Sequence, residues 1–395
     1  MINRARNPAF IQNSCTYTHA AANWRTSATT RNSAPRASWP PGAFCSSPVF
    51  CSWNQVAMNL QTEALGSDDV SAIDELRDVY RQLKSELAKV IVGQDTVVEQ
   101  LAICLFARGH ALLVGVPGLA KTLLVSRLAE TMSLGFSRIQ FTPDLMPMDI
   151  TGTDILQETA EGRRQFEFLK GPVFANIVLA DEINRAPSKT QAAMLEAMQE
   201  HRVTVVGRPY PLDPPFFVLA TQNPVEQEGT YPLPEAQLDR FMFLISVDYP
   251  SRTEELEIAR TTTGGATPRL EQIIDGNTVR RFQDLVRRVP VPTHIYEFAV
   301  DLVRRTRPKT PESPAWLKPL VAWGAGPRAV QYLILGARSR AALNGSYMVR
   351  LDDLMAVAEP VLTHRVLTTF AAESEGATSG SIVRRLVTEL TRERS

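Results

Sequence analysis

A short segment that combines glycines with a lysine and a threonine is the part of this sequence best suited to chemistry. It follows the apolar run 111–114 and precedes a helical pattern of apolar residues. A loop between a strand and a helix binds phosphates through its backbone N–H groups and the positive end of the helix. The residues predicted to bind a nucleotide here are Gly115, Val116, Pro117, Gly118, Leu119, Ala120, Lys121 and Thr122.

Three side chains of this loop have distinct expected roles. Lys121 would reach the outer phosphates of ATP, and the Thr122 hydroxyl would ligate Mg²⁺. Ala120 stands where the motif usually has a second glycine. Alanine is acceptable there if the residue has helical backbone angles, so we interpret the segment as a variant phosphate-binding loop.

Two adjacent carboxylates, Asp181 and Glu182, follow the apolar run 177–180. Neighbours at a strand end point to different sides, so Asp181 could face Mg²⁺ and Glu182 the γ-phosphate. Hydrolysis needs one carboxylate for the metal and another acceptor to polarise the attacking water. The alternative is an ordinary exposed strand end, which the position about sixty residues after a phosphate loop disfavours.

Three further polar residues are candidates for the same site. Asn223 follows the apolar run 217–220, and ligands of parallel sheets lie at such strand ends. Arg240 could be an arginine finger that stabilises transition-state charge on ATP bound to a neighbouring subunit. Arg328, at a predicted helix start, could contact phosphate in a similar way. The alternatives are a turn for Asn223 and surface charge for the arginines.

Composition limits the class of protein. The chain has 395 residues, 44% of them hydrophobic, and a formal net charge of zero. It can form two or three domains, and its charge gives no indication of nucleic-acid binding. No apolar run is long enough to span a membrane. The four cysteines, Cys15, Cys45, Cys51 and Cys104, include no C-x-x-C pair, which favours a reducing cytoplasm.

The first 62 residues differ from the rest of the chain. They contain five arginines but no lysine and no acidic residue, and they lack helical or strand periodicity. We therefore expect disorder in 1–62. The segment resembles a transit peptide, and the favoured alternative is that translation begins at Met58.

Alternating short apolar strands and helices predict an α/β fold with a parallel sheet covered on both faces. We expect this core at 71–250, a smaller all-helical domain at 255–373 and a separate C-terminal helix at 374–395. Two segments, 153–170 and 203–212, read as β-hairpins. Helix starts are predicted from the capping pairs Ser71/Asp74, Ser188/Gln191 and Ser251/Glu254.

Over about residues 71–373 the chain resembles the MoxR family of AAA+ ATPases, which are P-loop NTPases. The motifs that carry the resemblance lie at 92–94, 109–122, 138–152, 180–187, 220–224 and 228–241. The resemblance implies that 115–122 is Walker A and that Asp181-Glu182 is Walker B. It implies that Asn223 is sensor 1, Arg240 the arginine finger and Arg328 sensor 2, whether in cis or in trans. It also implies that Gly93 and Gln94 lie near the adenine.

The same resemblance implies a Mg²⁺-dependent, chaperone-like ATPase that forms a ring, expected as a hexamer. Both hairpins would face the pore of the ring or a partner. The family pattern suggests a client protein that needs activation or metal-cofactor insertion, and a von Willebrand A-domain partner. The alternatives are a magnesium-chelatase-like subunit, a DNA-directed motor, which the neutral charge disfavours, and a nucleotide sensor that does not hydrolyse ATP.

Overall fold

The computed structural model describes residues 65–116, 118–158, 164–224, 229–264 and 268–394. Three predictions concern other residues and are not tested by the structure: disorder in 1–62, the role of Pro117, and the turn of the first hairpin at 160–162. The described residues belong to one compact unit.

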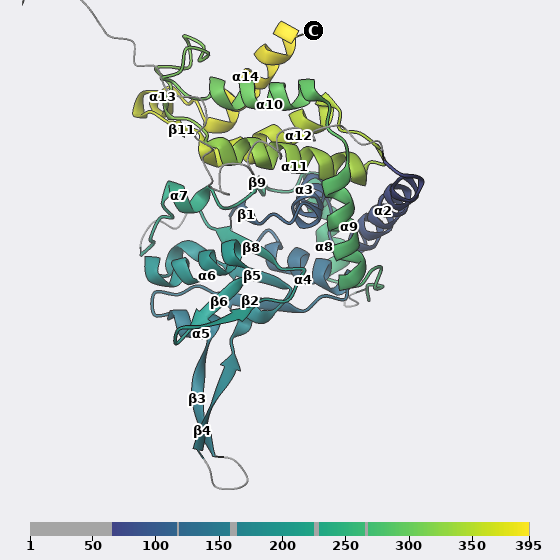
Figure 1. Ribbon diagram of the computed structural model, residues 1–395, viewed down its shortest axis with the longest axis vertical. Helices are drawn as coiled ribbons and strands as arrows, with labels where there is room; N and C mark the ends of the chain where they lie inside the picture. Colours follow the sequence, from purple (N-terminus) through teal and green to yellow (C-terminus); the bar gives the residue numbers. More distant parts are fainter. Residues whose placement is uncertain (1–64, 117, 159–163, 225–228, 265–267, 395) are drawn as a thin grey trace, which may run out of the picture. The chain divides into compact units, whose positions relative to one another are not determined.

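A five-stranded parallel sheet forms the centre of the fold, as predicted (Figure 1). Its spatial order is β2-β5-β8-β1-β9, so the strand after the phosphate loop lies at one edge. The strands are β1 (Ala111–Val114), β2 (Phe136–Gln140), β5 (Ile177–Asp181), β8 (Phe217–Gln222) and β9 (Phe243–Ser246).

Helices cover both faces of the sheet because successive strand residues point to opposite sides. Val178 packs in the hydrophobic cluster on one face, while Leu179 packs in the cluster on the other. The helices of this part are α3 (Asp95–Phe106), α4 (Lys121–Thr131), α5 (Pro147–Thr151), α6 (Ser188–Glu200), α7 (Glu235–Leu238) and α8 (Arg252–Thr262), with 3₁₀ turns η1 (Pro172–Phe174) and η2 (Ile183–Arg185).

Both predicted hairpins are present. The first pairs β3 (Gly152–Glu158) with β4 (Arg164–Lys170) and projects away from the sheet (Figure 1). The second pairs β6 (Arg202–Val205) with β7 (Arg208–Pro211). Phe168 of the first stacks on Tyr210 of the second, with ring centroids 3.9 Å apart. This aromatic pair fixes the base of the projecting hairpin.

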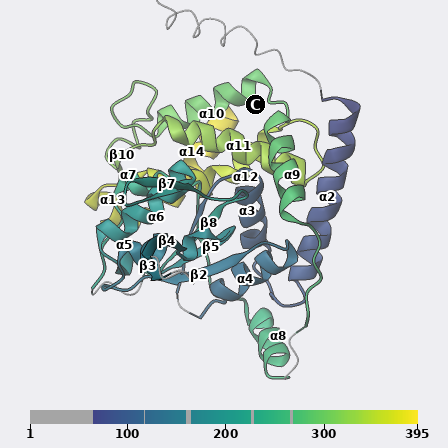
Figure 2. The ribbon, with the colours of Figure 1, turned by 60° about the horizontal axis from the view of Figure 1, so that its bottom comes forward.

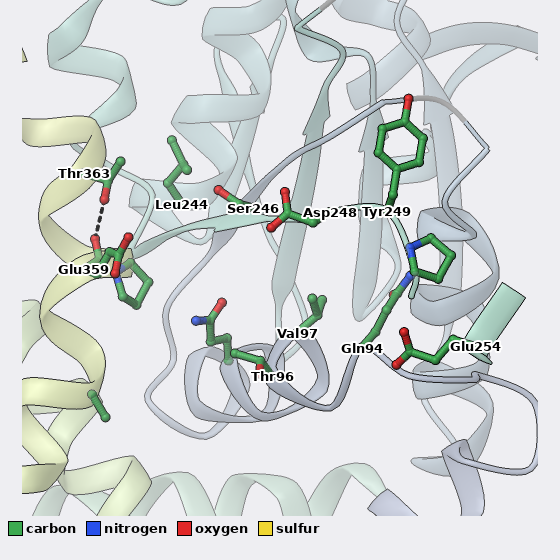
Figure 3. A pocket seen from close by; sticks show the side chains of 14 residues that line it. Gln94, Thr96, Val97, Leu244, Ser246, Asp248, Tyr249, Glu254, Glu359 and Thr363 are labelled. Carbon is green, nitrogen blue, oxygen red and sulfur yellow. Dashed lines mark hydrogen bonds between the residues drawn. The ribbon is translucent and has the colours of Figure 1, made fainter. Parts of the chain in front are cut away.

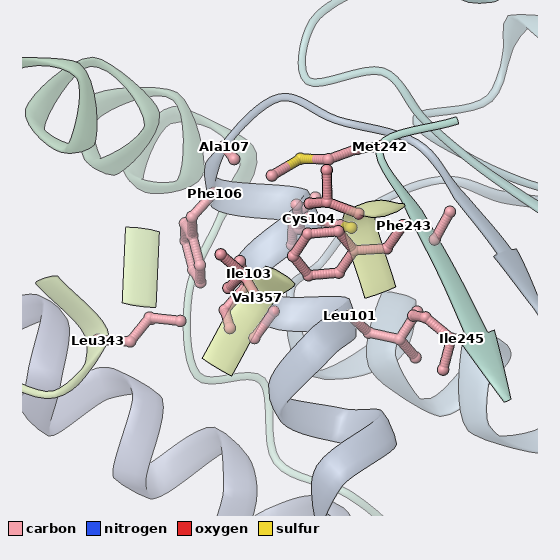
Figure 4. Close-up of a cluster of buried hydrophobic side chains, with 14 of the residues drawn as sticks. Leu101, Ile103, Cys104, Phe106, Ala107, Met242, Phe243, Ile245, Leu343 and Val357 are labelled. Atoms are coloured by element: carbon pink, nitrogen blue, oxygen red, sulfur yellow. The ribbon is translucent and has the colours of Figure 1, made fainter. Parts of the chain in front are cut away.

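The C-terminal part is mostly helical, as predicted, although residues 321–323 and 367–368 pair as a small antiparallel sheet that the all-helical prediction did not include. This part shares a hydrophobic core with α2 (Ser67–Leu87) and α3. Figure 4 shows Cys104 and Phe243 in this core beside Val357. The last helix does not pack separately, since it contacts α10 and α12. The elements are α9 (Gly276–Arg288), α10 (Thr293–Arg305), β10 (Val321–Trp323), α11 (Pro327–Leu343), α12 (Leu351–Leu362), η3 (Thr363–Arg365), β11 (Leu367–Thr368), α13 (Phe370–Ser374) and α14 (Ser379–Arg394).

Only one of the three predicted capping pairs is correct. Ser251 and Glu254 form the capping box of α8. Helix α2 begins four residues before Ser71, whose hydroxyl instead donates to the Asp68 carbonyl. Helix α6 has Pro187 as its N-cap, which leaves Gln191 free to donate to the carbonyls of Ile183 and Tyr231.

None of the described helices is both long and apolar enough to cross a membrane.

A buried histidine should make the stability of the fold depend on pH. The Val218 N–H donates to Nδ1 of His110, and Nε2 lies 3.1 Å from the Met198 carbonyl, which fits a neutral ring with its proton on Nε2. Burial lowers the pKa of His110 to about 4. Between pH 6.5 and 4 the unfolded chain therefore binds more protons, and stability falls as the pH is lowered.

The contribution of His110 to this loss should be at most about 3 kcal/mol. Urea unfolding of His110→Gln at pH 7 and pH 4.5 should show a smaller pH-dependent loss than the wild-type chain. The exposed His294 supplies the control His294→Gln, which should keep the full loss. Burial also lowers the pKa of His364, so part of the loss should persist in His110→Gln. If His110→Gln lost as much stability as the wild-type chain between pH 7 and pH 4.5, His110 would not be a source of the pH dependence.

Candidate active site

The predicted phosphate loop connects the end of β1 to the start of α4, and its glycines are needed where they stand. A Cβ atom at Gly115 would lie 2.5 Å from the Val247 carbonyl oxygen, so only glycine allows this approach to the end of β9. Gly118 has φ +88°, in the left-handed region that favours glycine. The loop therefore has a backbone that few other residues could adopt.

The expectation that Ala120 has helical backbone angles is wrong. Its φ is 54° and its ψ is 21°, which is the left-handed conformation. A Cβ atom in this conformation crowds the following carbonyl and costs about 1–2 kcal/mol. Ala120 is thus a strained residue in a position that suits glycine.

Replacing Ala120 by glycine should relieve this strain and raise the free energy of unfolding by about 1 kcal/mol, net of the added chain entropy. Urea denaturation measures the change. Ala88 is exposed and has right-handed helical angles, so Ala88→Gly is the matched control and should lose a few tenths of a kcal/mol. A loss of stability in Ala120→Gly would show that Ala120 is not strained.

A cavity of about 430 Å³ opens beside the loop, and seven of the fifteen predicted site residues line it. Lys121 Nζ donates to the Gly115 carbonyl at 2.6 Å. Burial lowers the pKa of Lys121, and the charges of Asp181 and Glu182 oppose that shift. The residues that line the cavity are Gly118, Ala120, Lys121, Thr122, Leu123, Arg138, Asp181, Glu182, Thr221 and Asn223.

Asp181, the last residue of β5, has a different partner on each carboxylate oxygen. Oδ1 accepts a hydrogen bond from the Thr221 hydroxyl at 2.6 Å. Oδ2 accepts from Arg138, with distances of 2.6 Å to Nη2 and 3.0 Å to Nε. Asp181 is thus oriented by one neutral and one cationic neighbour.

Glu182 has left-handed backbone angles, with φ 56°, so its side chain does not continue the alternation of β5. Its N–H donates to the Thr221 hydroxyl at 2.9 Å. Its Oε2 accepts from Gln140 Nε2 at 2.9 Å and pairs with Arg185 Nη1 at 3.0 Å. Strained non-glycine residues concentrate at functional sites, and here the strain turns a carboxylate into the cavity.

The oxygen donors of the cavity fit a magnesium ion. Thr122 and Asp181 line the same cavity, and Mg²⁺ bound with a nucleotide uses one or two protein oxygens besides phosphate and water. Asn223 is buried at the end of β8 and brings an amide to the same edge of the sheet. Among the described residues no cluster of three or more His, Cys, Asp or Glu could hold a metal alone.

A second cavity, of about 550 Å³, lies between the start of α3, the end of β9 and helix α12 (Figure 3). Gln94 lines it, and its Nε2 donates to the Leu119 carbonyl of the phosphate loop at 3.2 Å. Gln94 Oε1 is buried and has no hydrogen-bond partner among the described residues. Neighbouring Gly93 has φ +68°. The cavity therefore adjoins the loop, and one of its lining residues has a buried acceptor without a partner among the described residues.

Arg240 and Arg328 line neither cavity. Arg328 instead lies close to the Arg240 segment, because Arg328 Nη1 pairs with Asp239 Oδ2 at 3.1 Å. The hydroxyl of Tyr332, one turn further along α11, donates to the Arg240 carbonyl at 3.1 Å. Buried Arg365 donates to both the Asp239 side chain and the Phe241 carbonyl. Helix α11 and the 3₁₀ turn η3 of the C-terminal part thus hold the Arg240 segment in place.

Four residues with contacts in or near the site were not predicted: Arg138, Gln140, Thr221 and Arg365. Arg138 and Gln140 alternate on β2, and they reach Asp181 and Glu182 because β2 pairs with β5 in parallel register. Two long polar side chains at alternating positions of β2 were a usable signal. The sequence did not show that β2 lies next to β5, which is what brings these side chains to the carboxylates.

Comparison with known families agrees with this geometry. Residues 110–243 match the ATPase family associated with various cellular activities (AAA), and residues 315–386 match an AAA lid domain. A solved structure of a candidate ATPase from Cytophaga hutchinsonii superposes with a TM-score of 0.75 at 41% identity, covering 80% of this chain and 96% of that chain. The fold and site define an AAA+ ATPase.

Two relatives identify the family within this class. Chaperone MoxR1 of Mycobacterium tuberculosis is 44% identical over 302 residues, which is 76% of this chain and 79% of that protein. Protein MoxR of Methylorubrum extorquens is 31% identical over 327 residues, 74% of this chain and 89% of that protein. The chain belongs to the MoxR family of AAA+ ATPases.

Proposed function

We propose that this chain is a Mg²⁺-dependent ATPase whose hydrolytic site is shared between subunits of a ring. The observation that carries the proposal is the cavity that gathers Lys121, Thr122, Asp181, Glu182 and Asn223 beside the loop between β1 and α4. Membership of the AAA+ class supports it. The domain limits at 250, 255 and 373 remain predictions.

ATP would bind across both cavities. Its phosphates occupy the cavity beside the loop, and its adenine lies in the adjoining cavity near Gly93 and Gln94. The buried Gln94 Oε1 suits the exocyclic amine of adenine, since each otherwise lacks a partner. The hydrogen bond from Gln94 to Leu119 connects the two halves of the site.

The side chains around the phosphates have separable roles. Lys121 neutralises charge on the outer phosphates, and Thr122 and Asp181 hold Mg²⁺, which stabilises charge developing on the phosphate oxygens. Glu182 orients the attacking water and accepts its proton. To do so it must leave Gln140 and Arg185, which hold it now. Asn223 is positioned to hydrogen-bond the γ-phosphate or the water.

Arg240 and Arg328 complete the site of the neighbouring subunit. Both lie outside the two cavities assigned to ATP, and the ion pair of Arg328 with Asp239 keeps Arg328 close to the Arg240 segment. Arg328 would therefore act in trans together with Arg240. A heterologous contact of this kind forms a ring where the rotation between subunits closes, and we expect that ring to be a hexamer.

Hydrolysis would be converted into movement of a client protein by the hairpins. The first hairpin carries Leu156 and Phe166, directly opposite each other in register, with 55% and 73% of their side chains exposed. Such apolar residues at the end of a projecting hairpin suit contact with an unfolded or flexible protein segment. The family resemblance favours a von Willebrand A-domain partner, metal-cofactor insertion as the task and a cytoplasmic location.

Phosphate release from ATP by the purified full chain tests the proposal. We expect release that requires Mg²⁺, and Lys121→Ala should bind a fluorescent ATP analogue at least tenfold more weakly, because a charge-assisted contact to phosphate is lost. Exposed Lys318 supplies the control Lys318→Ala. Equal affinity of Lys121→Ala and wild type would contradict the assignment of the loop.

A further inference from the structure

Helix α8 has no buried residue, although it follows the strand that borders the nucleotide cavities. Figure 2 shows it projecting from the rest of the described chain. Only Glu254 and Ile258 are even partly buried. Leu256 on α8 and Tyr249 just before it have 44% and 71% of their side chains exposed. A short helix that buries so little does not gain its stability from its own chain.

An apolar pocket separate from both nucleotide cavities lies where β10 leads into α11. It has a volume of about 300 Å³ and includes Pro308, Trp323 and Pro327 in its lining. Trp323 has 66% of its side chain exposed. Two fixed contacts shape the pocket: the Ala325 N–H donates to the buried Thr306 hydroxyl, and Arg307 Nε donates to the Ala325 carbonyl.

The two surfaces lie on opposite sides of the predicted subunit contact. Glu254 lines the cavity next to the phosphate loop, so α8 starts on the face that presents ATP. Pro327 lines the apolar pocket and directly precedes Arg328, so the pocket lies on the face that presents the arginines. Resting on the shared-site function above, we propose that α8 of one subunit docks at the Trp323 pocket of the next.

Charge and apolar surface match between these partners. Glu255 and Glu257 are exposed in the middle of α8, between the exposed Arg252 and Arg260, while Arg307 and exposed Lys309 line the pocket. Tyr249 and Leu256 supply apolar side chains for a pocket whose aromatic wall is Trp323. Apolar anchors within a charged rim are typical of protein–protein contacts. The occupant is therefore a second copy of this chain.

Site-directed photocrosslinking tests the contact directly. The full chain with p-benzoylphenylalanine in place of Trp323 is assembled with ATP, irradiated and analysed by mass spectrometry. Crosslinks should join position 323 to residues 249–262 of another copy. Crosslinks only to other segments, such as the 152–170 hairpin, would overturn the proposal.

Charge exchange provides the second test. Lys309→Glu, or Glu255→Lys with Glu257→Lys, should each raise the chain concentration needed for assembly at least tenfold in sedimentation with ATP, and combining the changes should restore most of the loss. Exposed Lys318 and Glu375 supply the controls Lys318→Glu and Glu375→Lys, which should assemble as wild type.

Binding of a fluorescent ATP analogue distinguishes a failure of the α8 contact from a failure of the ATPase proposal. Interface variants should keep wild-type affinity as monomers, because neither Trp323 nor Lys309 lines a nucleotide cavity. Wild-type assembly by every charge variant would overturn the α8 contact and leave the ATPase proposal standing. A wild-type chain that binds ATP but stays monomeric would overturn the ring and this contact together.

Discussion

Replacing Glu182 by glutamine should leave ATP bound but slow its hydrolysis by about two to three orders of magnitude, as expected for loss of a general base. Glutamine has nearly the same shape and can still contact Gln140, but it cannot accept the proton of the attacking water. Single-turnover phosphate release measures the rate, and a fluorescent ATP analogue measures affinity. The affinity should change less than threefold, since Lys121 and the loop are intact.

The control for this variant is another carboxylate outside the cavity. Exposed Glu196 on α6 contacts Thr204 and not the site, so Glu196→Gln should hydrolyse ATP at the wild-type rate. Unchanged turnover in Glu182→Gln would remove Glu182 as the base. Equal slowing in both variants would indicate a general effect on the fold rather than on the chemistry.

The parts of the site that lie on one strand and its following loop could be predicted from the sequence. Asp181 and Glu182 follow a short apolar run of the length typical of a buried strand, and parallel strands bring their carboxyl ends to one edge. The structure accordingly places both beside Lys121 and Thr122. The local sequence pattern was sufficient to predict these positions, because a residue that directly follows a parallel strand must lie at the carboxyl edge of the sheet.

Features that depend on strand order or backbone angle could not be predicted. Arg138 and Gln140 meet the carboxylates only because β2 lies next to β5, which periodicity does not encode. The left-handed angles of Ala120 oppose its intrinsic preference and arise from the loop around it. The ion pair of Arg328 with Asp239 joins residues in different parts of the chain. In each case tertiary structure overrides the local signal.

The position of Arg240 and Arg328 outside the nucleotide cavities leads to a second prediction of a large loss in the rate of ATP hydrolysis. Arg240→Ala should slow hydrolysis by about three orders of magnitude, the effect typical of a missing arginine finger, while each protomer still binds ATP. Arg328→Ala should behave in the same way if both act on the neighbour. Tyr332 and Arg365 contact the Arg240 segment through backbone oxygens and the Asp239 carboxylate, so the Arg240 substitution should leave the local fold unchanged.

Mixed rings decide whether the arginine acts on its own ATP or on the neighbour's. Arg240→Ala keeps an intact phosphate loop, and Lys121→Ala keeps an intact arginine, so neither ring alone is active. In a random equal mixture about a quarter of the sites combine an intact loop with an intact arginine from the next subunit. Activity should therefore return to roughly that fraction of wild type. Native mass spectrometry must establish that mixed rings formed, and mixed rings without activity would show that Arg240 acts within its own subunit.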